Sequence, residues 1–342
     1  MFLIEFRDRF LDAVLGVLWA QWTELGVGGL QGSGASLIDP EVLLLATSRF
    51  AVYDPRLFDE VLDWLSCNSQ SLDVTRLRRL GAKSPVPDVP VLTVLTDFMS
   101  AQSESQKWEG SVRALLARED RATYAVPRAL FLARDGSSLP VLGAPDPFFA
   151  AHGFERPELL PRGLSRQPDV RRPALGRLRL RALLGHGVRA EVVGFLATHT
   201  HAHGRLISQR AGFAQRQVAE YLGALTDSGF AERWEDGRTV QNRLDAGFSA
   251  SLGEFAAYVD WAGAWSVVAA LWAAFDATAT EPGNYAESKV WREALTVVRA
   301  STPIDGFELT IPVPADHPGE RILEYAEAYV AMVTGVLDEL GR

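Results

Sequence analysis

The chain has few of the residues on which several classes of protein depend. Cys67 is the one cysteine among 342 residues, so no disulfide can form within the chain and a cytoplasmic location is expected. No run of roughly 18 uncharged apolar residues occurs, which argues against a membrane-spanning helix and a membrane partner. The first ten residues carry charges at short intervals, which predicts an amphipathic helix rather than a signal peptide.

Motifs for nucleotide binding and catalysis are also scarce. Gly32-Ser33-Gly34 lacks the third glycine of a dinucleotide loop, and the sequence contains no Gly-x-x-x-x-Gly-Lys-Ser/Thr phosphate-binding loop. The neighbouring carboxylates Asp59 and Glu60 fit a solvated helix face, and no Ser/His/Asp set stands out. We therefore expect neither an enzyme nor a cofactor.

Three closely spaced histidines form the one cluster with metal-ligand character: His199, His201 and His203. Alternate residues of a strand share a face, so three imidazoles in a strand would converge. The cluster instead lies in a loop between two predicted helices, with no cysteine or carboxylate at ligand spacing. A surface loop without metal is the favoured interpretation, and a three-histidine metal site is the alternative.

Residues 188–244 carry the most regular local pattern in the chain. Val218, Leu222 and Leu225 fall on one face of a helix, and Asp236-Gly237 is a typical hairpin turn. A glycine before such a helix allows a sharp bend with positive φ. The predicted elements are helices over 188–198, 206–211 and 214–227, a turn at Gly212-Phe213, and strands over 230–234 and 239–244.

The order of these elements resembles the winged helix-turn-helix of bacterial transcription regulators, in particular the arsenical-repressor-like branch. The resemblance covers roughly a sixth of the chain. It implies a DNA-binding module with a recognition helix over 214–227 and a wing over 230–244. It rests on Ala211-Gly212-Phe213, on Arg216-x-Val218-x-x-x-Leu222-x-x-Leu225, on Gly229-Phe230 and on Asp236-Gly237-Arg238.

The outer face of the recognition helix follows from its buried face. With Val218 at the centre of the buried face, Arg216 and Glu220 lie opposite, and Gln215 and Gln217 flank the arginine. In the motif that the chain resembles, this N-terminal end enters the major groove, where Gln and Arg bind adenine and guanine edges. A carboxylate at Glu220 weakens the case unless it contacts a cytosine amino group. The alternative is a polar helix end without a partner.

Charge is strongly segregated along the chain, although the net charge is −9. Residues 162–216 contain eleven arginines and two acidic residues, for a net charge of +9, whereas residues 245–342 carry −10. A dense arginine block around such a motif is typical of phosphate attraction. The alternative for the segment 177–181, with arginine at every second position, is a solvated face.

Arginines beyond the recognition helix are also expected to contact double-stranded DNA. The wing tip presents Arg238 to phosphate or the minor groove, unless Arg238 only pairs with Glu235 or Asp236 across the turn. The residues expected to contact DNA besides the helix end are Arg177, Arg179, Arg181, Arg205, Arg210, Arg233, Arg238 and Arg243.

The predicted fold class is mainly α, with a central winged helix-turn-helix flanked by helical domains. Asp39-Pro40 and Asp54-Pro55 each predict an aspartate N-cap followed by proline in the first helical turn. Further helices are predicted over 74–80, 89–101 and 107–117. The predicted regions are a helical domain over 1–120, a Pro/Arg-rich connector with a small hairpin over 121–187, the winged module over 188–244, and a helical region over 245–342.

The tryptophans Trp261, Trp265 and Trp272 fill a core with residues 1–120 in the favoured interpretation, and a dimer interface is the alternative. Together these features predict a cytoplasmic DNA-binding transcription regulator acting as a homodimer, with helical domains that sense a ligand or partner protein. The alternative is an antitoxin-like interaction module that binds a partner protein through its helical regions.

Overall fold

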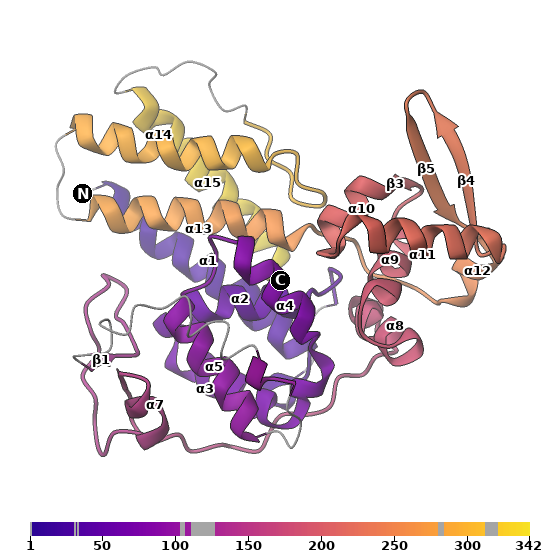
Figure 1. The fold of residues 1–342 in the computed structure, drawn as a ribbon. Coiled ribbons are helices and arrows are strands. Elements are labelled where there is room, and N and C mark those ends of the chain that lie inside the picture. The colour runs from indigo at the N-terminus through magenta and orange to yellow at the C-terminus, as the bar shows by residue number, and fades with distance from the viewer. Residues whose placement is uncertain are drawn as a thin grey trace.

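The computed structural model describes residues 2–30, 32, 34–102, 107–110, 127–279, 284–311 and 321–342. The chain is mainly helical, which confirms the predicted fold class at that level. Two parts are visible in Figure 1. We call the larger part, formed by residues before 176 and after 258, the helical body, and residues 176–258 the central module. No helix in the described part of the chain is long and apolar enough to cross a membrane.

The helical body is built from both ends of the chain. A two-residue parallel pair, β1 (Arg128–Ala129) with β2 (Phe154–Glu155), lies at its edge. Its helices before the module are α1 (Phe2–Glu24), α2 (Pro40–Phe50), α3 (Pro55–Asn68), α4 (Val74–Lys83), α5 (Val89–Gln102) and α7 (Pro147–Ala151). Its helices after the module are α13 (Trp261–Thr278), α14 (Asn284–Ser301) and α15 (Ile322–Leu340).

Helix starts in the body follow the predicted capping pattern. Asp39 accepts a hydrogen bond from the amide of Val42 at 3.2 Å, and Asp54 accepts one from the amide of Leu57 at 3.0 Å. A proline occupies the first turn of α2 and of α3, as the sequence predicted. The helix predicted over 107–117 lies largely outside the described residues.

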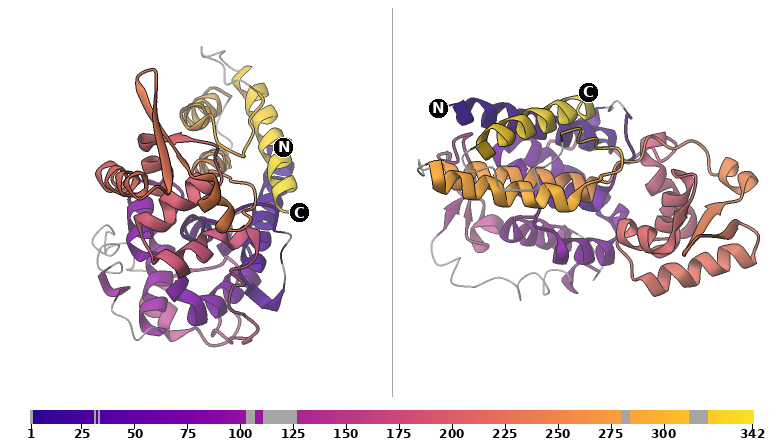
Figure 2. Two further views of the ribbon diagram at one scale, coloured as in Figure 1. Left: turned by 90° about the vertical axis from the view of Figure 1, so that its right-hand side faces the viewer. Right: turned by 90° about the horizontal axis from the view of Figure 1, so that it is seen from above.

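One hydrophobic core joins the two ends of the chain. Trp261, Trp265 and Trp272 are buried, and Trp272 stacks on Phe10 while Trp265 packs beside Phe50. Helix α15 lies along α1, and α13 lies along α14 (Figure 2). The predicted core role of the tryptophans is confirmed. Both helical regions predicted over 1–120 and 245–342 contribute to this one core.

The central module has its own smaller core and projects from one side of the body. Its sheet has the order β3-β5-β4, and all its pairs are antiparallel. Its elements are α8 (Gly176–Leu184), α9 (Val188–Ala197), β3 (Ala202–His203), α10 (Gly204–Ala211), α11 (Gln215–Asp227), β4 (Ala231–Asp236), β5 (Thr239–Leu244) and α12 (Ala246–Ser251).

Helix α8 corrects one prediction. The sequence predicted an irregular connector up to residue 187, whereas residues 176–184 are helical. Leu178 and Leu180 are buried on opposite sides, against the body core and the module core respectively. The helix ends at Gly185, whose φ of 78° favours glycine. Upstream, Leu139 donates to the carbonyl of Phe131, so a small hairpin exists where the sequence predicted one.

Candidate nucleic-acid interface

Helix α11 exposes a polar face at its N-terminal end. Val218, Leu222 and Leu225 are buried against the module core, so the opposite side of the helix faces solvent. Arg216 and Glu220 lie on that solvent side and form an ion pair at 2.8 Å, with side chains 89% and 63% exposed. The buried stripe predicted from the sequence is therefore the one observed.

The turn before α11 is shaped by glycine and a side-chain bond. Gly212 has a φ of 75°, and Ser208 donates to the carbonyl of Phe213 at 2.8 Å, which closes the turn. Gln215 is exposed beside Arg216, whereas the side chain of Gln217 accepts a hydrogen bond from Arg79 of α4 at 3.3 Å. The outward polar end of α11 is therefore centred on Gln215 and Arg216.

The β4–β5 hairpin extends away from the module as an exposed arm (Figure 1). Gly237 lies at its tip with a φ of 61°, and Arg238 follows it. Arg243 pairs with Glu232 across the strands at 2.6 Å and lies over the ring of Trp234. Arg238 and Arg233 are exposed and form no ion pair with any described residue.

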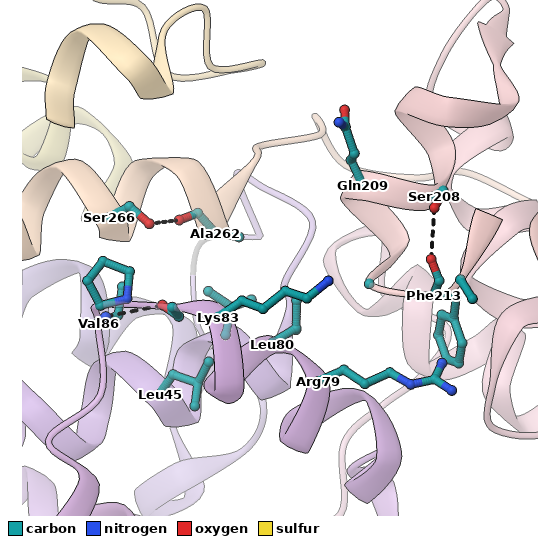
Figure 3. A pocket seen from close by; sticks show the side chains of 15 residues that line it. Leu45, Arg79, Leu80, Lys83, Val86, Ser208, Gln209, Phe213, Ala262 and Ser266 are labelled. Carbon is teal, nitrogen blue, oxygen red and sulfur yellow. Dashed lines mark hydrogen bonds between the residues drawn. The ribbon is translucent and has the colours of Figure 1, made fainter. Parts of the chain in front are cut away.

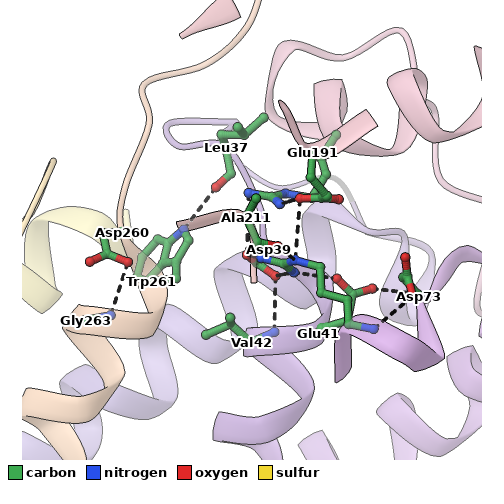
Figure 4. A network of polar contacts seen from close by, with 12 residues as sticks. Leu37, Asp39, Glu41, Val42, Asp73, Glu191, Ala211, Asp260, Trp261 and Gly263 are labelled. Atoms are coloured by element: carbon green, nitrogen blue, oxygen red, sulfur yellow. Dashed lines mark hydrogen bonds and ion pairs between the residues drawn. The ribbon is translucent and has the colours of Figure 1, made fainter. Parts of the chain in front are cut away.

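Arg177 and Arg181 do not face solvent, so their predicted contacts with DNA were wrong. Both are buried in what we call the ionic network. Its carboxylates Asp39, Glu41 and Glu191 are labelled in Figure 4. Arg181 bonds Glu41 of α2 at 2.6 Å and Glu191 of α9 at 2.8 Å. The network consists of Asp39, Glu41, Arg76, Arg177, Arg181 and Glu191.

The ionic network lowers the pKa of two of its buried carboxylates, Asp39 and Glu191. Burial alone raises the pKa of Glu191, but the guanidinium groups of Arg177, Arg76 and Arg181 outweigh it and lower that pKa. The pKa of Asp39 is likewise raised by burial and lowered far more by its arginine neighbours. The network therefore holds charged groups of opposite sign across the contact between body and module.

Two further arginines are occupied within the protein. Arg179 donates to the carbonyl of Glu254 at 2.6 Å and lies over the ring of Phe255. Arg210 pairs with the buried carboxylate of Asp260. Arg179 thus binds within the central module, and Arg210 ties the module to the start of α13. Their contacts with phosphate stay predictions.

Most arginines of residues 162–216 thus pair with carboxylates of the protein itself, either buried or at its surface. Four of the eleven arginines in residues 162–216 form no ion pair with the described residues. They are Arg166, Arg179, Arg189 and Arg205. The arginines of residues 162–216 that do form ion pairs are Arg162, Arg171, Arg172, Arg177, Arg181, Arg210 and Arg216. Residues 188–244 contain seven arginines and six acidic residues, so this part of the module is nearly neutral.

The three histidines have separate local contacts. The ring of His199 stacks on Phe195 with centroids 3.9 Å apart, and His203 accepts a hydrogen bond from the Leu206 amide at the start of α10. His201 is exposed beside Trp234. Across the described residues, no group of three or more His, Cys, Asp or Glu side chains is placed to hold a metal ion.

Sequence reasoning missed helix α4 as a partner of the module. Arg76 donates to the carbonyl of Ala211, and a Cβ on Gly212 would lie 3.1 Å from Leu80. A signal was present, because Asp39 and Glu41 stand at the start of a strongly apolar helix and buried carboxylates need cationic partners. The sequence around Asp39 and Glu41 does not show which cations are their partners.

Comparison with protein-family models finds no matching family, and comparisons with curated proteins and with solved structures find no significant match.

Proposed function

We propose that residues 188–244 are a winged helix-turn-helix that binds double-stranded DNA, and that the protein is a sequence-specific transcription regulator acting in the cytoplasm. The observation that carries the proposal is the exposed N-terminal end of α11, where Gln215 and Arg216 point away from the module core. An exposed hairpin follows this helix, and together they match the order of the motif that the sequence resembles.

Base recognition is assigned to Arg216 and Gln215. An arginine makes two parallel bonds to guanine, and a glutamine makes two to adenine. Arg216 first leaves Glu220, and an exposed pair at this spacing stabilises a helix by only about 0.3–0.5 kcal/mol. Glu220 then becomes available to accept from a cytosine amino group. Gln217 is a weaker candidate than the sequence predicted because Arg79 already binds it.

Backbone contacts are assigned to the wing and to α10. Arg233 and Arg238 of the hairpin and Arg205 of α10 are exposed cations without carboxylate partners in the described part of the chain. Phosphate contacts fix the position of a protein on the duplex and carry little sequence information. We propose that these three arginines position the module and that α11 selects the sequence.

A homodimer is part of the proposal. One module offers two or three side chains to base edges, which limits the sequence it can specify. Regulators of this motif commonly bind two half-sites about one helical turn apart. Light scattering of the free protein and of its DNA complex tests this, since one protomer per duplex would refute it.

A protein-binding role is the second candidate, and the near neutrality of the module favours it. Mixed charge on an exposed surface suits a protein partner better than a polyanion. In this antitoxin-like alternative, the helical regions bind a partner protein and DNA contact is secondary or absent.

Selection of DNA fragments from a random pool by the purified full-length protein separates the two candidates. A specific regulator enriches a common sequence, and Arg216→Ala then loses that enrichment. Arg292→Ala on the exposed side of α14 serves as the matched control and should retain it. Failure of the parent protein to enrich any sequence would refute specific DNA binding and favour the protein partner.

A further inference from the structure

A cavity of about 530 Å³ lies where α4 meets the turn between α10 and α11 (Figure 3). Its size falls within the range of small-molecule sites in proteins, roughly 300–1,000 Å³. Leu45, Leu80 and Val86 of the body and Phe213 of the module form apolar parts of its wall. The cavity is therefore shared between the body and the module.

Two cations line this cavity without any carboxylate beside them. Lys83 points across it from the end of α4, and Arg79 extends below Phe213 (Figure 3). Lys83 and Arg79 form no ion pair with any described residue, and no acidic residue lines the cavity. This differs from the ionic network, where every arginine is matched by carboxylates.

The hydroxyls that line the cavity are already engaged. Ser208 donates to the carbonyl of Phe213, Ser266 donates to the carbonyl of Ala262, and Ser84 accepts a hydrogen bond from the amide of Val86. The charged donors of Lys83 and Arg79 thus remain the principal polar groups for an occupant. A neutral polar molecule would leave them without a counter-charge, and a cation would be repelled.

We propose that the cavity binds a small amphipathic anion, with an apolar ring or chain against the wall and one carboxylate or sulfonate at Lys83 and Arg79. Burial of the apolar part supplies affinity roughly in proportion to area. Charge-assisted hydrogen bonds from the two cations select the anionic group.

Occupancy of the cavity is coupled to α11 through Arg79. That guanidinium now donates to the side chain of Gln217 at 3.3 Å and lies over the ring of Phe213. An anion that draws Arg79 toward itself releases Gln217 beside the base-contacting end of α11. The regulatory half of the proposal, in which the anion changes DNA affinity, rests on the proposed DNA binding. The anion then changes DNA affinity because it binds more tightly when Arg79 is turned toward the cavity than when Arg79 is bonded to Gln217.

Fluorescence titration of the full-length protein with 8-anilinonaphthalene-1-sulfonate tests the site, with uncharged N-phenyl-1-naphthylamine as its matched analogue. We expect saturable binding of the sulfonate, about tenfold tighter than that of the analogue. Lys83→Met should weaken sulfonate binding about tenfold, whereas Lys289→Met on exposed α14 should not. Ala262→Trp, which fills the cavity from its exposed edge, should abolish binding.

Two results would overturn the site: absence of saturable sulfonate binding, or equal affinity in Lys83→Met and Lys289→Met. Weaker DNA binding by Lys83→Met with unchanged sulfonate binding would show that this lysine contacts phosphate instead, which also overturns the site.

The regulatory half is tested on selected DNA with and without saturating sulfonate. A change in DNA affinity of about fivefold or more is expected in the parent protein and is expected to vanish in Arg79→Met. An unchanged affinity in the parent overturns the coupling. Sulfonate binding as expected, together with no DNA enrichment at all, leaves the anion site standing and refutes the proposed function.

Discussion

Arg76 of α4 donates from Nε to the carbonyl of Ala211, the last residue of α10, at 2.9 Å. The same guanidinium bonds Asp39 at 2.5 Å and Glu41 at 2.7 Å, so it is held on both sides. The side chain is 1% exposed. The turn that precedes α11 is therefore fixed by a buried cation of the body, and its orientation depends on the ionic network.

Removal of one cation from the ionic network should destabilise the protein. We expect Arg181→Met to lower the free energy of unfolding by about 3–5 kcal/mol, because Glu41 and Glu191 stay buried with fewer counter-charges. Arg171→Met, at a side chain that is 87% exposed, is the matched control and should change it by less than about 0.5 kcal/mol.

Urea unfolding measures both variants. The double variant Arg181→Met/Glu41→Gln should be more stable than Arg181→Met alone, since it removes one of the two buried carboxylates that have lost Arg181 as a counter-charge. A single variant as stable as the parent would contradict the role given to the network.

The contribution of Glu191 should depend on pH. Its pKa lies below the ordinary value of 4.5 in the folded protein because the arginines outweigh its burial. A lowered folded-state pKa stabilises the protein above the ordinary pKa, and this is lost as pH falls through the lowered pKa. We therefore expect the stability difference between the parent and Glu191→Gln to be constant from about pH 7 to 5 and to shrink below 4.5.

Unfolding midpoints in urea over this pH range test the expectation. Glu232→Gln, which removes an exposed pair with Arg243, is the control and should differ little from the parent at any pH. A Glu191→Gln difference that grows as the pH falls would have the opposite sign and would refute the argument.

Sequence selectivity should depend on Arg216. We expect Arg216→Ala to lose about 1–3 kcal/mol on the selected duplex, with little change on a scrambled duplex. Fluorescence anisotropy with both duplexes measures the ratio. Equal losses on the two duplexes would show that Arg216 contacts phosphate rather than a base.

The wing should affect affinity without selecting sequence. Arg238→Ala is expected to weaken matched and scrambled duplexes by similar factors, because a wing arginine meets the backbone or minor groove. Arg243→Ala is a useful comparison, since Arg243 already pairs with Glu232 and should matter less. If Arg238→Ala leaves both affinities unchanged, the hairpin is not a DNA contact.

The salt dependence of DNA binding should be modest. The sequence predicted a steep dependence from a +9 block, but the structure leaves mainly Arg205, Arg216, Arg233 and Arg238 available at the module. Of these, Arg205, Arg233 and Arg238 are assigned to phosphates, so at about 0.9 per phosphate contact the slope of log K against log salt should be about 3 per protomer.

Titrations of the parent and of Arg205→Ala test this, and the variant should lower the slope by about 1. Arg171→Met should leave it unchanged. A slope near 9 would mean that the whole arginine block reaches DNA after all.

Local patterns predicted the elements of the module well. Strand β5 spans the predicted 239–244, and α11 begins one residue after the predicted start at 214. The apolar stripe of a helix and an Asp-Gly turn involve residues only a few positions apart, so they can be recognised in a single sequence. Strand β3 was missed because two residues carry no alternating pattern.

The partners of the arginines could not be predicted. Arg181 bonds Glu41, which is 140 residues away in the sequence, and Arg210 bonds Asp260, which is 50 residues away. A single sequence shows that Arg177 and Arg181 are charged, but not whether a folded neighbour supplies a carboxylate. The candidate DNA surface is consequently smaller than the arginine count implied, and the cavity beside Lys83 had no signal in the sequence.

The chain passes between the body and the module twice, and the two connecting segments lie next to each other. Ala256 donates to the carbonyl of Pro173, and Leu37 of the body donates to the carbonyl of Ala257. Two adjacent connecting segments do not by themselves fix the angle between the module and the body. The angle is set by side chains such as Arg76 and Arg181, so substitutions there should change the orientation of the module as well as the stability of the protein.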